Sequence, residues 1–239
     1  MSETVNGDLI PSPEVLFAEN PEQRCPCILL LDVSGSMSRD HNGSSAIDQL
    51  CEGLKLLKET IAADSVASKR VEVAVVTFGE NVTVLQDFVP VEYFYPPELI
   101  ASGMTPMGQA INCALEMLDS RKEVYKASGI SYYRPWVFLI SDGAPTDYGW
   151  EDAVKRIHEA EDARKLVFFV IGVEPASMEV LNHVAYPQRA AVKLKDQKDS
   201  FSELFKWLSS SMSAVSRSAE SGGQVDLPTP AGWANIATS

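Results

Sequence analysis

The chain has 239 residues, of which 45% are hydrophobic, so it is long enough to bury one large core and is near the upper size of a single domain. Its 33 acidic and 20 basic side chains give a formal net charge of -13. This charge argues against nucleic acid and anionic membranes as partners and favours cations or basic protein surfaces.

The N-terminal residues 1–24 are predicted to be an irregular leader, because prolines interrupt them repeatedly. They contain no basic signal-type segment, and the apolar run over 27–31 is too short to span a membrane. The four cysteines lack the spacing of a zinc site and are interpreted as reduced thiols. We therefore expect a cytoplasmic protein that is neither exported nor anchored.

The first regular element is a strand over residues 26–32. This short, uninterrupted apolar run ends at Asp32, which is typical of a strand buried on both faces. A helix is predicted next, because Ser45 and Asp48 have the spacing of a capping box and apolar residues recur at helical intervals over 47–61.

The middle of the chain predicts a hairpin followed by a helix. Apolar runs over 71–78 and 82–85 are separated by a short glycine-containing turn, which indicates two antiparallel strands. Further on, Thr105 precedes Pro106, and proline is favoured at the first position of a helix. We therefore predict that a helix with an apolar stripe begins there.

The remaining elements continue the alternation of strands and helices. Strands are predicted over 135–143, 166–173 and 190–194, and helices over 150–164, over 176–183 and from Ser200 onward. This alternation predicts an α/β fold, a doubly wound and mostly parallel sheet with one antiparallel edge strand and helices on both faces. We assign residues 25–217 to this domain.

Residues 218–239 are rich in Ser, Gly and Pro and are predicted to be a flexible C-terminal tail. Within the tail, Trp233 stands among proline and glycine residues. It is interpreted as a short docking motif, as a cover for the protein's own surface, or as part of a disordered end.

Polar side chains follow two of the predicted buried strands. Asp32, Ser34 and Ser36 lie at and after the end of the first strand, and Asp142 lies at the end of a later one. Thr105 precedes a helix in the segment SGMTPMGQA. Ligands of open α/β sheets bind beyond the carboxyl ends of the strands, so these oxygen donors are expected to meet there. Two carboxylates and three hydroxyls suit a hard cation such as Mg²⁺.

The segment LLLDVSGSM, together with Thr105 and the later Ser-Asp-Gly, resembles the von Willebrand factor A domain over roughly residues 25–215. The resemblance implies a complete metal-ion-dependent adhesion site made by Asp32, Ser34, Ser36, Thr105 and Asp142. It also implies that Mg²⁺, or alternatively Mn²⁺ or Ca²⁺, binds there and accepts an Asp or Glu of a partner protein as its last ligand.

Three further stretches, FYPPELIASGMTPMGQAI, RPWVFLISDGAPTD and LFKWLSSSMSAVS, resemble the bacterial tellurium-resistance proteins of the TerY type. That resemblance implies a cytoplasmic protein in a stress-response assembly. It also implies association with a PP2C-like phosphatase and a protein kinase.

Structural roles compete with these functional ones. The segment from Asp32 to Ser36 has the composition of a simple Asx turn, which the presence of Thr105 and Asp142 makes less favoured. Thr105 could also serve as a helix N-cap. Asp147 could be a second metal ligand or a catalytic acid, but we favour an N-cap for the helix that begins near residue 150.

Two functions from different classes follow. The favoured one is a Mg²⁺-dependent protein-binding module that is not an enzyme. The alternative is a phosphohydrolase of the haloacid-dehalogenase type with Asp32 as nucleophile and Asp142 or Asp147 on the metal. That chemistry requires a second aspartate two positions on, where this chain has Ser34. A third possibility is a domain that keeps its ligands but binds partners through another face.

Overall fold

The structure of the protein is a computed structural model that describes residues 4–5, 8–41, 43–173, 176–195, 200–218 and 234–236. The tail residue Trp233 lies outside these described residues. None of the described helices is both long enough and apolar enough to cross a membrane.

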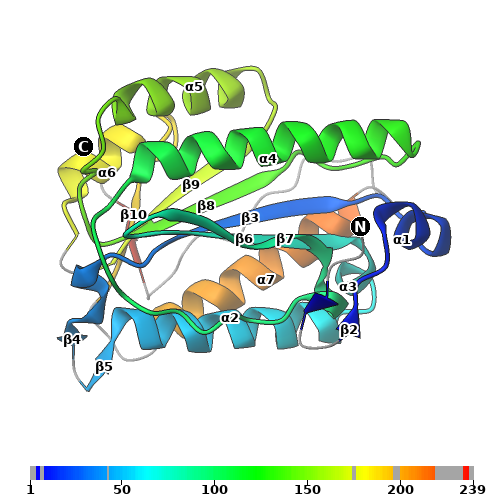
Figure 1. Ribbon diagram of the computed structural model, residues 1–239, viewed down its shortest axis with the longest axis horizontal. Coiled ribbons are helices and arrows are strands. Elements are labelled where there is room, and N and C mark those ends of the chain that lie inside the picture. Colours follow the sequence, from blue (N-terminus) through cyan, green and yellow to red (C-terminus); the bar gives the residue numbers. More distant parts are fainter. Residues whose placement is uncertain are drawn as a thin grey trace.

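The centre of the molecule is a seven-stranded sheet in the order β11-β10-β9-β8-β3-β6-β7 (Figure 1). The parallel strands are β3 (Cys25–Asp32), β6 (Val71–Phe78), β8 (Trp136–Ser141), β9 (Val167–Gly172) and β10 (Val192–Leu194). Strand β7 (Val82–Pro90) pairs antiparallel with β6 at one edge, and β11 (Ala234–Ile236) pairs antiparallel with β10 at the other. The predicted mostly parallel sheet is confirmed, with a second antiparallel strand added at the far edge.

Helices cover both faces of the sheet (Figure 1). Helices α2 (Ala46–Ala63) and α7 (Ser200–Ser218) lie on one face, and α4 (Met107–Ala127), α5 (Trp150–Asp162) and α6 (Met178–Val184) lie on the other. Short elements complete the fold: α1 (Pro13–Glu19), α3 (Ala67–Arg70), the 3-10 turns η1 (Gly35–Ser38) and η2 (Val91–Tyr93), and the two-residue strands β1 (Thr4–Val5), β2 (Asp8–Leu9), β4 (Asp40–His41) and β5 (Ser44–Ser45).

The all-apolar sequence of β3 follows from its place between two cores. Leu29 and Leu31 belong to the core formed with α2 and α7, whereas Ile28 and Leu30 point to the opposite core with α4 and α5. All four side chains are fully buried. Burying each one contributes about 1.5–3 kcal/mol, so this strand is fixed firmly before it delivers Asp32 to the edge of the sheet.

The predicted start of α2 is confirmed. The side chain of Ser45 accepts a hydrogen bond from the backbone N–H of Asp48 at 3.2 Å, and the Asp48 carboxylate accepts one from the Ser45 N–H at 3.3 Å. Helix α4 begins one residue later than predicted, with Pro106 as its N-cap residue instead of its first helical residue.

The prediction of an irregular leader is wrong for residues 13–19, which form α1. Pro13 starts this helix instead of interrupting it, because the first helical residue needs no N–H donor. Arg24 fixes the end of α1 by donating hydrogen bonds to the carbonyls of Asn20 at 2.5 Å and Lys69 at 2.6 Å. The tail also contributes strand β11, which its composition did not predict.

Candidate metal centre

The predicted site residues lie at the carboxyl end of the parallel sheet. Asp32 is the last residue of β3, and Asp142 directly follows β8. These two strands are neighbours that pair in parallel, so their ends open at the same edge. The 3-10 turn η1, which carries Ser36, follows Asp32 at the left end of the molecule in Figure 1.

Four of the five predicted residues form one chain of hydrogen bonds. The Ser34 N–H donates to Asp32 Oδ1 at 2.8 Å. The hydroxyls of Ser34 and Ser36 lie 3.0 Å apart, and Ser36 Oγ donates to Asp142 Oδ1 at 2.8 Å. Residues that are 106 positions apart in sequence therefore meet through their side-chain oxygens. The turn after β3 directs its hydroxyls toward a second carboxylate, which a simple Asx turn does not require.

Ser141 is a site residue that the sequence analysis missed. Its hydroxyl donates to Asp32 Oδ2 at 2.5 Å and accepts a hydrogen bond from the Gly143 N–H at 3.2 Å. As the last residue of β8 it belongs to a strand expected to be apolar, and its side chain points to the end of β3. The sequence signal that could have indicated this role is the hydroxyl side chain at the last position of an otherwise apolar strand.

The Asp32 carboxylate is fully buried, and this burial raises its pKa from 3.8 to about 6. The carboxylate of Asp142 raises the pKa further, whereas hydrogen bonds from Ser141 and Ser34 lower it. The partners of Asp32 in these bonds are neutral groups, which stabilise a negative charge less than a cation does. A divalent cation beside the two aspartates would compensate this buried charge.

Thr105 reaches the site because its loop is hydrogen-bonded to the loop that follows β3. The Ser102 N–H donates to the Val33 carbonyl at 2.6 Å, and the Gly35 N–H donates to the Gly103 carbonyl at 3.1 Å. Gly103 has a φ of 78°, and a Cβ there would lie 2.3 Å from the nitrogen of Glu80, so only glycine fits.

The Thr105 side chain is buried next to the backbone that follows Asp142. A Cβ built on Gly143 would lie 3.5 Å from Thr105 Oγ1. Thr105 does not cap α4, because Pro106 holds the N-cap position and makes no side-chain capping bond. Its hydroxyl lies beside the backbone of Gly143, the residue after Asp142.

The loop after β8 clamps the start of α4. The Thr105 N–H donates to Thr146 Oγ1 at 2.9 Å, and the Thr146 N–H donates back to the Thr105 carbonyl at 2.9 Å. The Asp147 carboxylate accepts hydrogen bonds from the backbone N–H groups of Gly108 at 3.2 Å and Gln109 at 2.9 Å. Asp147 thus takes the first free N–H groups of α4.

The expectation that Asp147 caps the helix near residue 150 is therefore wrong. The N-cap residue of α5 is Gly149, with a φ of 76°. Sequence proximity favoured α5, but the loop folds across the start of α4, and the free N–H groups there are nearer to the carboxylate.

The assembled donors are two carboxylates and three hydroxyls, all oxygen atoms, which is the ligand chemistry of Mg²⁺, Mn²⁺ or Ca²⁺. Among the described residues, no group of three or more His, Cys, Asp or Glu side chains could hold a metal ion. A metal at this edge of the sheet would consequently depend on the hydroxyl ligands as well as on Asp32 and Asp142.

The sequence profile of the von Willebrand factor type A domain matches residues 27–207. Among solved structures, the pilus adhesin SpaC from Lactobacillus rhamnosus GG superposes with a TM-score of 0.63 at 13% identity, over 81% of this chain and 31% of that one. The D319A mutant of the PilB minor pilin from Streptococcus sanguinis gives 0.60 at 12% identity, over 85% and 64%. The ArnB paralog VWA2 from Sulfolobus acidocaldarius gives 0.52 at 16% identity, over 79% and 45%.

At these identities the superpositions show a shared fold alone. The chain covers 31% to 64% of the length of those three proteins. No curated protein sequence matches the chain significantly.

Proposed function

Because this chain belongs to the von Willebrand factor type A domain family, we propose that it is a protein-binding module with a Mg²⁺ ion held by Asp32, Ser34, Ser36, Thr105 and Asp142. Domains of this family commonly mediate metal-dependent interactions between proteins. The observation that carries the proposal is the chain of hydrogen bonds from Asp32 to Asp142 through the two serine hydroxyls. It assembles oxygen donors from separate loops at the carboxyl end of the parallel sheet.

The partner group is proposed to be an Asp or Glu side chain. Both oxygens of Asp32 already accept hydrogen bonds, from the Ser34 N–H and the Ser141 hydroxyl. The three hydroxyl ligands are neutral. A divalent cation in this setting retains a strong attraction for one more carboxylate, because hard cations prefer anionic oxygen ligands.

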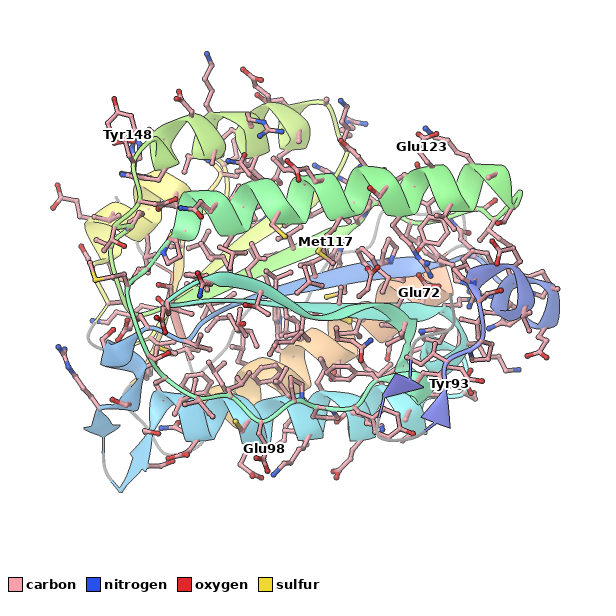
Figure 2. The ribbon with its side chains drawn as sticks, in the orientation of Figure 1. Glu72, Tyr93, Glu98, Met117, Glu123 and Tyr148 are labelled. Atoms are coloured by element: carbon pink, nitrogen blue, oxygen red, sulfur yellow. The ribbon has the colours of Figure 1, made fainter. Side chains whose placement is uncertain are left out.

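Three strongly exposed apolar side chains lie on the loops that carry site residues: Ile100, Met104 and Tyr148, here called the apolar rim. Tyr148 is fully exposed, and Ile100 and Met104 are 81% and 64% exposed. Ile100 and Met104 lie on the loop that carries Thr105, and Tyr148 lies on the loop that carries Asp142; Figure 2 shows Tyr148 projecting from that end. The other large apolar side chains exposed in the described part of the chain are 42–46% exposed: Val15, Val84 and Leu85.

Exposed apolar side chains grouped beside a polar site are typical of a protein-binding surface. We therefore propose that the acidic residue of the partner is flanked by apolar residues that pack on the rim. The metal supplies orientation and charge attraction, and the rim supplies buried apolar area.

A binding role is also favoured over the phosphohydrolase alternative. The alternative chemistry needs a general acid two positions after its nucleophile. The position that would carry the general acid is Ser34, whose hydroxyl lies against Ser36. We propose that the protein is not an enzyme.

The cellular setting is proposed from the resemblance of the three sequence stretches alone. It is a cytoplasmic bacterial stress-response assembly of the tellurium-resistance type, with a PP2C-like phosphatase and a protein kinase as candidate partners. Binding assays with such a purified phosphatase and kinase, with Mg²⁺ and with EDTA, test this directly.

The metal site is tested by calorimetric titration of Mg²⁺ and Mn²⁺ into the wild type and two serine variants. Ser36→Ala removes the hydroxyl that joins Ser34 to Asp142 and is expected to weaken metal binding at least tenfold. Ser38→Ala is the matched control, because Ser38 lies on the same turn but its hydroxyl donates to the Gly35 carbonyl. Equal metal affinity in both variants would refute the proposed ligand set.

Partner recognition is tested by capture from a bacterial lysate with Mg²⁺ or EDTA. A partner that is retained only with Mg²⁺ and lost with Ser36→Ala supports the metal-dependent contact. A partner that remains bound under EDTA and to Asp32→Ala would instead show that another face of the domain binds it.

A further inference from the structure

A groove of about 830 Å³ lies at the end of the domain opposite to the metal centre. It is formed where α4 and α5 end and where β8 and β9 begin. Five of the chain's 20 Lys and Arg residues line it, against two of its 33 acidic residues. These cationic side chains are Lys122, Lys126, Arg134, Arg164 and Lys165.

The acidic residues of the groove do not neutralise it. Lys122 pairs with Asp119 at 3.4 Å, and Lys126 pairs with Glu123 at 2.7 Å. Both acids are more than 70% exposed, so water screens their charges. Figure 2 shows Glu123 pointing outward from α4 at this end.

Two further cations lie on the other wall of the groove, Arg164 and Lys165. Neither forms an ion pair with any residue that the structure describes, and both are exposed. Arg134, between the two walls, donates to the carbonyls of Leu166 at 2.5 Å and Glu161 at 2.9 Å, and its Nη2 lies 3.8 Å from the buried Glu161 carboxylate. The cations of the groove without an ion pair among the described residues are therefore Arg164 and Lys165. The groove thus presents a surplus of positive charge in a strongly acidic protein.

The cations are close enough to repel one another. Burial lowers the pKa of Lys122; Asp119 raises it, and the charges of Lys165 and Lys126 lower it. Burial likewise lowers the pKa of Arg134; Glu161 raises it, and the charges of Arg189 and Arg164 lower it. An anion bound among these side chains would relieve this repulsion.

The backbone at Arg164 is held in a conformation that arginine disfavours. Its φ of 54° is the only positive φ of a non-glycine residue in the described ranges. The Arg164 N–H donates to the Glu161 carbonyl at 2.9 Å, and the Lys165 N–H donates to the Ala160 carbonyl at 2.8 Å. These bonds define a Schellman motif at the end of α5, where glycine is the least strained residue.

The strained position therefore carries a long cation where a glycine would be more stable, and that cation lines the groove. Strain of this kind is concentrated at functional sites.

We propose that this groove binds a short acidic segment of a partner protein. Its volume accommodates a few side chains, and its excess cations match Asp and Glu residues. A nucleic acid or an anionic membrane would extend beyond the groove and meet a surface of overall charge -13. A metal-dependent contact at one end and an acidic segment at the other would let this chain join two partners.

The test is the fluorescence anisotropy of a labelled hexaglutamate peptide, with hexaglutamine as its neutral control. EDTA is present throughout, so that no divalent ion can hold the peptide at the metal centre. The wild type is expected to bind hexaglutamate and not hexaglutamine, and binding should weaken as salt is raised.

Arg164→Gly and Lys165→Gln are each expected to weaken hexaglutamate binding about two- to fivefold, as the loss of one exposed charge contact predicts. Arg164→Gly also relieves the strained backbone, so lost binding cannot be attributed to unfolding. Arg164→Lys should retain binding. Lys155→Gln is the matched control, because Lys155 is an exposed cation of α5 outside the groove.

Hexaglutamate affinity that is absent in the wild type, or equal in Lys165→Gln and Lys155→Gln, would overturn the proposal. A single-stranded hexanucleotide that binds more tightly than the peptide, and is lost with the same variants, would assign the groove to nucleic acid instead. Ser36→Ala should bind hexaglutamate as the wild type does, which separates this outcome from any failure of the metal centre.

Discussion

Each end of the sheet contains a buried carboxylate, but the groups that surround the two carboxylates differ. At the carboxyl end of the strands, Asp32 accepts hydrogen bonds from Ser34 and Ser141, and its pKa is raised to about 6. At the opposite end, Glu72 Oε2 accepts bonds from Arg121 Nε at 2.9 Å and Nη2 at 2.7 Å. Figure 2 shows Glu72 at the far end from Tyr148.

The Glu72 network takes its partners from within the chain, although Arg24 Nε and Glu72 Oε1 form no hydrogen bond in the described structure. Tyr125 also donates to Glu72, and Arg24 lies 3.6 Å from Glu72 Oε1. The ring of Phe17, from α1, packs against the guanidinium groups of both Arg24 and Arg121, at 5.1 and 5.2 Å from its centroid. This network therefore anchors α1, whereas the charge of Asp32 is left for a cation from outside. The contrast separates a structural carboxylate from one available for function.

Glu72→Gln is expected to have the largest effect on the stability of the protein. The substitution leaves two buried arginines without a counter-charge, and such a loss typically costs about 3–5 kcal/mol of unfolding free energy. Urea denaturation followed by circular dichroism measures it. The control is Glu123→Gln, whose exposed side chain should change stability by less than about 0.5 kcal/mol. Equal effects would show that the buried network does not stabilise the fold.

Asp32→Asn should act in the opposite direction on the metal-free protein. Because the charged carboxylate is disfavoured in the folded state, the neutral amide is expected to raise stability at pH 7.5 by about 1–3 kcal/mol. Mg²⁺ should stabilise the wild type and not the variant. Asp119→Asn, at an exposed acid, is the control in the same urea experiment. A less stable metal-free Asp32→Asn protein would contradict this account.

The contribution of Asp32 to the stability of the protein depends on pH, and its sign follows from the raised pKa. The folded pKa of Asp32, about 6, lies above its ordinary value of 3.8, so the folded state binds this proton more tightly than the unfolded state. Its contribution to stability therefore increases as the pH falls from 7.5 to 5.5, by about 1 kcal/mol. Subtracting the unfolding free energy of Asp32→Asn at each pH isolates this group. Over the same range Mg²⁺ affinity should fall about fourfold, because the proton competes with the metal.

Asp147→Asn tests the clamp that connects the metal-site loops. The loss of the negative charge at the start of α4 should lower stability by about 0.5–1 kcal/mol. It should also weaken metal binding, since Thr105 is held by the same loop. Glu116→Gln, at an exposed position in the middle of α4, is the control. Metal affinity unchanged from the wild type would show that the clamp does not position Thr105.

The smallest effect on stability is expected at the apolar rim. Met104→Ser and Tyr148→Ser change exposed side chains and should alter unfolding free energy by less than about 0.5 kcal/mol, with Mg²⁺ affinity unchanged. Capture of the metal-dependent partner should nevertheless fall. Leu85→Ser, an exposed apolar residue of β7, is the control. Undiminished capture by both rim variants would restrict recognition to the metal contact.

Much of the fold could be predicted because its signals are local. The apolar run of β3, the capping box of α2 and the strand over 71–78 each follow from a few neighbouring residues. The leader was mispredicted at Pro13, because proline marks both the interruption of a helix and its first turn. The packing of Phe17 on Tyr125 in the folded protein distinguishes these two roles of Pro13.

It could be predicted from the sequence that Asp32, Ser34 and Ser36 share one turn at the end of a buried strand. The apolar run and the turn residues that indicate this are neighbours in the chain. The sequence also predicted that Ser36 and Asp142 would lie at the same end of the sheet. Their direct hydrogen bond, the bond from Ser141 to Asp32 and the helix that Asp147 caps became known only from the folded structure. The cationic groove and the Glu72 network likewise could not be predicted from the sequence, because their charged side chains come from separate elements. Contacts of this kind depend on which strands become neighbours, and that is settled by packing the whole sheet between its two cores.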